Sequence, residues 1–138
     1  MLLYLSVLIL EDNLLVLSQL LKSLEYLERE QPYSLTLTVL TDSLQMKRLI
    51  NSNPDLEFDI ILLDRDCKLN GSFHELDIER LGVEKIIAIS SIIEYNDDLK
   101  KRGVKRLVEK DLSNLYNFNI ETMRHFSELM KITPPRKS

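Results

Sequence analysis

The sequence predicts an α/β fold built on a five-stranded parallel sheet, because strand-like runs alternate with segments of helical spacing along the chain. Three runs, residues 5–10, 60–63 and 86–89, are apolar almost throughout, as parallel strands covered on both faces are. Two further runs, residues 34–40 and 105–109, are half polar. Helices between the strands would supply the crossovers that parallel pairing requires.

The helical segments are marked by apolar spacing and by end signals. From Leu14 the apolar positions keep helical spacing until Pro32, with Asn13 as the expected N-cap. A second helix begins near Asp42, and a last helix spans about residues 113–131. Each segment is long enough to cover part of one face of the sheet.

Capping patterns mark the other helix ends. Gln45 follows Asp42, and Glu94 follows Ser91, at the three-residue spacing of a capping box. A short helix before the fourth strand is expected to be closed by Gly82. The Ser91 pattern predicts the start of the helix after the fourth strand.

Strand composition also predicts the order of the sheet. The three apolar strands belong in its middle and the two half-polar strands at its edges, which gives the order 2-1-3-4-5. This is a doubly wound sheet and a flavodoxin-like three-layer sandwich. At 138 residues the chain has the size of one domain. We expect that domain over residues 1–131, with residues 132–138 as a C-terminal tail or linker.

Polar side chains stand where the apolar strands end. Glu11 and Asp12 follow the first strand, Asp64 the third, Ser90 the fourth and Lys110 the fifth. The carboxyl ends of the strands face the ligand crevice in an open α/β sheet, so these side chains should converge. Two unit charges about 4 Å apart repel by roughly 4 kcal/mol at a surface-like dielectric, so clustered carboxylates need a cation. The pattern predicts a metal and phosphoryl site.

Composition excludes several classes of function. With 44% hydrophobic and 29% charged residues and a net charge of −4, the chain is typical of soluble globular proteins and lacks the basic footprint of nucleic-acid binding. The apolar opening is too short to span a bilayer and runs directly into acidic residues, so no membrane association is expected. The single cysteine, Cys67, excludes an intrachain disulfide and is consistent with a cytoplasmic location.

The segments VLILEDN, FDIILLDRD, IIAISS and RLVEKD resemble a response regulator receiver domain of two-component signalling, over about residues 4–131. The resemblance implies phosphorylation of an aspartate, with Mg²⁺ as cofactor. The roles it implies are phosphoacceptor for Asp64, contacts to the phosphoryl group for Ser90 and Lys110, direct metal ligation for Asp12, ligation through water for Glu11 and a metal-binding backbone carbonyl for Asp66.

The same resemblance implies the partners. A histidine kinase or a histidine phosphotransfer protein would donate the phosphoryl group. The signal would pass to a downstream protein or to an output domain outside this sequence. Such a domain is not an enzyme beyond its own phosphorylation and autodephosphorylation.

Several positions depart from the receiver pattern. Lys68 stands where the family commonly has proline, and Asp111 replaces a proline that often follows the lysine. Leu107 stands where many members carry tyrosine or phenylalanine, so an aromatic rotamer switch is unavailable. We therefore expect a signal to travel mainly through the loop from residue 90 to 96 and the helix that follows.

Two alternatives remain open. The D-x-D motif of Asp64 and Asp66 also resembles haloacid-dehalogenase-type phosphohydrolases, but those begin with this strand and need another acidic motif beyond the lysine. The other alternative is a receiver-like adaptor that works without phosphorylation. Labelling at Asp64 separates the three, because a phosphohydrolase turns over many phosphoesters, a receiver holds one phosphoryl group and an adaptor takes none.

Overall fold

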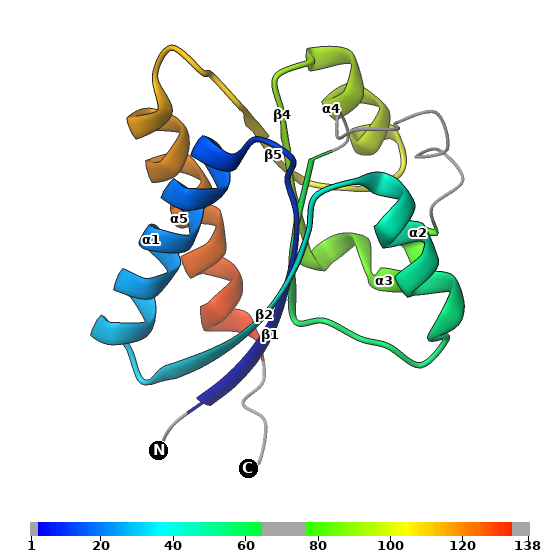
Figure 1. The fold of residues 1–138 in the computed structure, drawn as a ribbon, viewed down its shortest axis with the longest axis horizontal. Helices are drawn as coiled ribbons and strands as arrows, with labels where there is room; N and C mark the ends of the chain where they lie inside the picture. The colour runs from blue at the N-terminus through cyan, green and yellow to red at the C-terminus, as the bar shows by residue number, and fades with distance from the viewer. Residues whose placement is uncertain (1–2, 65–76, 134–138) are drawn as a thin grey trace.

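Five parallel strands form one sheet in the computed structural model, which describes residues 3–64 and 77–133 (Figure 1). The strands are β1 (Leu3–Leu10), β2 (Tyr33–Leu40), β3 (Ile60–Leu63), β4 (Ile86–Ser90) and β5 (Arg106–Glu109). Their order is β2-β1-β3-β4-β5, and every neighbouring pair is parallel. The fold class and strand order expected from strand composition are confirmed.

Helices cover both faces of this sheet. They are α1 (Leu14–Glu30), α2 (Ser43–Ser52), α3 (Ile78–Leu81), α4 (Ile93–Lys101) and α5 (Leu115–Ile132), with a 3₁₀ turn at Val83–Lys85. Figure 1 shows α1 and α5 together on one side of the sheet and α2, α3 and α4 on the other. The expected three-layer sandwich is confirmed. Among the described residues, no helix has the length and apolar character needed to cross a bilayer.

The core consists of two apolar layers, one on each face of the sheet. In β3, Ile60 and Leu62 pack toward α1 and α5, whereas Ile61 and Leu63 pack toward α2, α3 and α4. All four side chains are fully buried. Burying a side chain of this size stabilises the fold by about 1.5–3 kcal/mol, so β3 has no position for a polar residue. The acidic residue that this strand contributes, Asp64, therefore follows its last apolar residue.

The edge strands are half exposed, as their composition predicts. In β2, Leu37 and Val39 are exposed, and the backbone N–H of Leu35 donates to Glu28 Oε2 at 2.7 Å. This bond places an acidic side chain of α1 over the open edge of the sheet. Charged side chains at an edge discourage pairing with another chain.

Three of the expected helix ends are confirmed. Asn13 caps α1 by accepting hydrogen bonds from the backbone N–H groups of residues 15 and 16, and Asp42 caps α2 by accepting from Gln45 at 2.8 Å. The Gln45 side chain accepts in turn from the N–H of Thr41 at 3.2 Å. Gly82 ends α3 with φ of 95°, in the left-handed region that favours glycine.

The expected capping box at Ser91 and Glu94 is wrong. The N-cap of α4 is Ile92, which supplies no side-chain cap. The backbone N–H of Ile92 instead donates to Ser90 Oγ at 3.1 Å, so the chain turns at Ser90 and enters the helix one residue later than the motif indicates. Glu94 then lies at the second helical position and not at the third, which a capping box requires.

Arg80 stabilises the end of α2 from the neighbouring α3. Its guanidinium donates to the backbone carbonyls of Ile50 at 3.0 Å, of Asn53 at 3.4 Å and of Pro54. We expect Arg80→Ala to lower the free energy of unfolding by about 1 kcal/mol, because carbonyls at the end of α2 lose a charged donor. Urea denaturation measures this. Arg48→Ala, which removes an exposed arginine of α2, is the control; an equal loss in both variants would contradict the capping role.

Candidate functional site

The polar residues at the strand ends are positioned by the backbone ladder of the sheet. The N–H of Asp64 donates to the carbonyl of Leu10 at 3.0 Å, and the N–H of Lys110 donates to the carbonyl of Ser90 at 2.8 Å. The ladder therefore continues past the last apolar residue of each strand. It fixes the polar residues side by side at one edge, as the sequence analysis predicts.

Lys110 joins two buried carboxylates at this edge. Its Nζ lies 2.8 Å from Asp64 Oδ2, and 3.0 Å and 3.2 Å from the two carboxylate oxygens of Glu11. Glu11 and Asp64 have no exposed surface, and Lys110 is 5% exposed. Residues from the ends of β1, β3 and β5 thus form one desolvated ion cluster.

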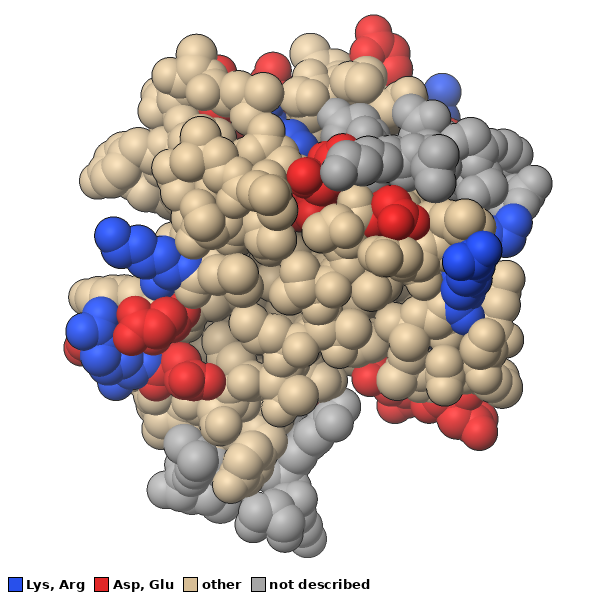
Figure 2. Space-filling view, viewed as in Figure 1, with Lys and Arg blue, Asp and Glu red and all other residues tan. Residues whose placement is uncertain are grey.

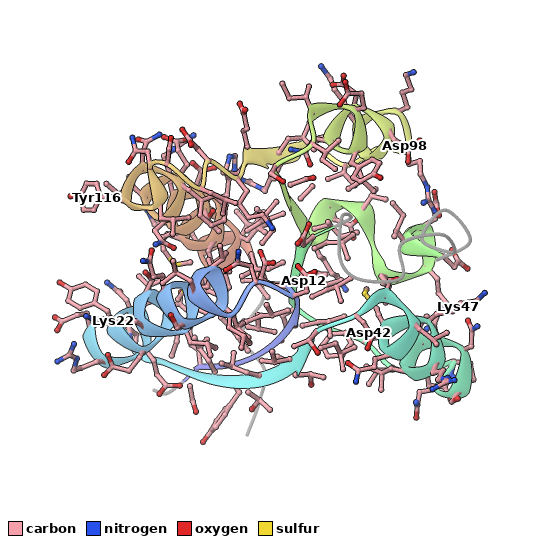
Figure 3. All side chains as sticks on the ribbon, turned by 45° about the horizontal axis from the view of Figure 1, so that its top comes forward. Asp12, Lys22, Asp42, Lys47, Asp98 and Tyr116 are labelled. Atoms are coloured by element: carbon pink, nitrogen blue, oxygen red, sulfur yellow. The ribbon has the colours of Figure 1, made fainter. Side chains whose placement is uncertain are left out.

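Asp12 adds a third carboxylate beside this cluster. Figure 3 shows Asp12 in the turn between β1 and α1, at the edge of the sheet where the strands end. Carboxylate oxygens of Glu11, Asp12 and Asp64 all lie within 4.8 Å of one another, and Asp12 is half-buried. The backbone N–H of Asn13 donates to Glu11 Oε2 at 3.0 Å and holds that carboxylate in place. The three carboxylates predicted as metal ligands are therefore gathered at one point.

Within the part of the chain that the structure describes, the cluster holds more carboxylates than ammonium groups. Burial alone would lower the pKa of Lys110, but the negative charges of Asp64 and Glu11 and their hydrogen bonds outweigh it and raise that pKa above its ordinary value. Among residues 3–64 and 77–133, one ammonium thus faces three carboxylates. Mg²⁺ prefers oxygen ligands and is commonly held by one or two carboxylates plus waters and phosphate oxygens, so the donor set fits this ion. Figure 2 shows acidic side chains in the upper part of this face and others at its left and lower right, so the buried cluster does not appear as a surface patch of its own.

Ser90 ends β4 beside the cluster and links it to α4. The side chain is fully buried, and its oxygen accepts the hydrogen bond from the N–H of Ile92. Ser90 thus connects the site to α4, because it accepts a hydrogen bond from the residue that precedes this helix. Asp66, Cys67 and Lys68 lie outside the described residues, so the expected carbonyl ligand and loop departure stay predictions.

One polar residue near the site escaped the sequence analysis. Asn96 of α4 is 8% exposed, and its Nδ2 donates to the backbone carbonyl of Val108 in β5 at 3.2 Å. Val108 lies in β5, two residues before Lys110, which directly follows that strand. Its signal in the sequence is a polar residue at a helix position that faces the sheet. The residue belongs to no capping or catalytic motif, so a search for motifs does not find Asn96.

The sheet order, the two helical layers and the site at the carboxyl ends of the strands together define the fold of a response regulator receiver domain. No family model matches the sequence, and no curated protein matches it. Solved structures share the fold over almost the whole chain.

A response regulator from Hahella chejuensis is 16% identical with a TM-score of 0.71, over 95% of this chain and 98% of its own. The Mn²⁺-bound form of the response regulator Rcp1 is 16% identical with a TM-score of 0.70, over 96% and 99%. The phosphorylated cyanobacterial phytochrome response regulator RcpA is 17% identical with a TM-score of 0.67, over 98% and 99%.

Proposed function

We propose that this chain is a phosphoacceptor receiver of a two-component or phosphorelay system, with Asp64 as the acceptor and Mg²⁺ as the cofactor. The observation that carries the proposal is the buried cluster in which Lys110 bridges Asp64 and Glu11 beside Asp12. Two similar structures are described as Mn²⁺-bound and as phosphorylated, which supports the same chemistry here.

The residues of the cluster suit phosphoryl transfer to a carboxylate. An oxygen of Asp64 forms a bond to phosphorus while the bond from phosphorus to the leaving atom of the donor breaks, and the leaving group departs with the electron pair. Such transfer depends on positioning and on neutralising charge at the phosphoryl oxygens. Lys110 supplies one positive charge at 2.8 Å from Asp64. Asp12 and Asp64 would hold Mg²⁺, which would supply the rest of the positive charge.

The added phosphoryl group gives Ser90 and Lys110 a new partner. The product carries close to two negative charges, and a hydroxyl and an ammonium are hydrogen-bond donors to such an anion. Because Ser90 also holds the N–H of Ile92, a shift of Ser90 moves the entry of α4. A histidine kinase or a histidine phosphotransfer protein is the donor class this chemistry requires, and a downstream protein or an output domain is the recipient of the signal.

Stoichiometric labelling tests the function against both alternatives. The chain is incubated with Mg²⁺ and a small phosphodonor, and both its intact mass and the phosphate released are followed. We expect one phosphoryl group per chain. Many turnovers of a phosphoester without retained label would support a phosphohydrolase, although in the described residues only α5 follows β5 and no further strand supplies that family's last acidic motif. No uptake would support the adaptor.

Asp12 tests the metal site separately from the acceptor. We expect Asp12→Ala to weaken Mg²⁺ binding at least tenfold, a loss of about 1.4 kcal/mol, because one of three clustered carboxylates is removed. Calorimetric titration of Mg²⁺ into both proteins measures this. Asp55→Ala, which removes a carboxylate far from the cluster in the α2–β3 connection, is the control. Equal titration curves for Asp12→Ala and parent would mean that Asp12 is only a solvated turn residue.

A further inference from the structure

Helix α4 is held to the sheet by few apolar contacts. Its buried residues are Asn96 and Leu99, whereas α1 buries four residues and α5 five. Its first residue, Ile93, is exposed, and no side chain caps its N-terminus. A helix with little buried apolar surface has a low free energy of local opening. Among the four longest described helices, α4 is therefore the one most easily displaced.

Asn96 is a buried residue near the middle of this helix, and only one of its two side-chain amide atoms has a hydrogen-bond partner among the described residues. Its Nδ2 donates to the carbonyl of Val108, while its buried Oδ1 has no hydrogen-bond partner among the described residues. The orientation is fixed, because only the NH₂ group can face a carbonyl oxygen. A buried acceptor without a partner is unfavourable, so among the described residues the bond to the Val108 carbonyl is the hydrogen bond by which the Asn96 side chain stabilises the docked helix.

The contact lies next to the residues that would sense a phosphoryl group. Val108 lies in β5, which ends one residue before Lys110, and the N–H of Lys110 donates to the carbonyl of Ser90 at 2.8 Å. Ser90 holds the other end of the connection, because its oxygen accepts from the N–H of Ile92. Residues 90 and 96 bound one short segment, and each is hydrogen-bonded to the β5 end of the sheet. Ser90 accepts from the N–H of Lys110, and Asn96 donates to the carbonyl of Val108.

We propose that Asn96 regulates the position of α4 as a latch, by which we mean a residue whose hydrogen bond to β5 keeps the helix docked on the sheet. At rest its bond to the Val108 carbonyl fixes the helix against β5, and occupancy of Asp64 by a phosphoryl group moves Ser90 and releases that bond. Asn96 thereby couples the phosphorylation site to α4, a role that no aromatic side chain can take at position 107, which is leucine. The proposal rests on the proposed function for its trigger, but the latch itself is a property of the resting protein.

Hydrogen exchange of residues 93–101 in the resting protein tests the latch without any ligand. Asn96→Leu should speed exchange of α4 at least fivefold, because the Val108 carbonyl loses its donor. Asn96→Asp should speed exchange at least fivefold, because an ionised carboxylate cannot donate to the Val108 carbonyl. Asn119→Leu is the matched control, since Asn119 also has a buried Oδ1 without a described partner but bonds Gln19 on the opposite side of the sheet. It should leave α4 unchanged.

The response is tested by adding beryllofluoride with Mg²⁺ as a phosphoryl mimic. In parent and Asn119→Leu, exchange of residues 93–101 should change at least threefold, and in Asn96→Leu the change should be lost although the mimic still binds. Unaltered resting exchange in both Asn96 variants, or a full response in Asn96→Leu, would overturn the latch. Failure of the parent to bind the mimic would overturn the proposed function instead, and the resting comparison alone would then decide on the latch.

Discussion

Asp64→Asn should abolish phosphoryl uptake, because the amide lacks the nucleophilic carboxylate oxygen and Asp64 is the carboxylate at the end of a central, fully buried strand. The expected loss is complete within the detection of intact-mass spectrometry. The measurement compares parent and variant after incubation with a small phosphodonor and Mg²⁺.

Asp42→Asn provides the matched control for this variant. Asp42 follows β2, in the same half of the molecule, but caps α2 and lies outside the ion cluster (Figure 3). Asparagine caps helices about as well as aspartate, so the fold should be unaffected and uptake should equal that of the parent. Undiminished labelling of Asp64→Asn would mean that another residue accepts the phosphoryl group.

Lys110→Met should have the largest effect on stability. The lysine is the positive partner of two fully buried carboxylates, and removing one partner of a buried ion pair costs about 3–5 kcal/mol. Because Mg²⁺ binds only the folded cluster, a concentration of 100 times its dissociation constant should restore about 2.7 kcal/mol. Urea denaturation with and without Mg²⁺ measures both numbers. A loss no larger than that of Lys22→Met, an exposed lysine of α1, would contradict the buried cluster.

The pH dependence of that loss has a definite sign. The folded state raises the pKa of Lys110, so its stabilising contribution is fully present below the unfolded pKa near 10.4 and is lost as the pH rises through the folded value. The titration of Lys110 therefore adds no slope to the stability difference between pH 7 and 9. The difference should shrink only in strongly alkaline solution.

The fold could be predicted because a parallel sheet imposes its burial on the sequence. Strand β3 is covered on both faces and is apolar at every position. Strands β2 and β5 are half polar, a composition that is tolerated because they lie at the two edges of the sheet. The same rule confined Asp64 and Ser90 to strand ends. Sequence alone therefore placed the side chains that the structure brings together.

The start of α4 could not be predicted from its motif. Ser91 and Glu94 have the spacing of a capping box, but the Ser90 oxygen competes for the entry of the helix and accepts from Ile92. Asn96 was missed for a related reason. Its role depends on a carbonyl of β5 that is twelve residues away in sequence, and local spacing carries no information about such a contact.

The mass of the intact parent chain after incubation with a small phosphodonor, with Mg²⁺ or with a chelator, tests the central claim most directly. The buried cluster of Glu11, Asp64 and Lys110 beside Asp12 predicts a gain of one phosphoryl group per chain with Mg²⁺ and little or none with the chelator. An unchanged mass in the presence of Mg²⁺ would contradict it.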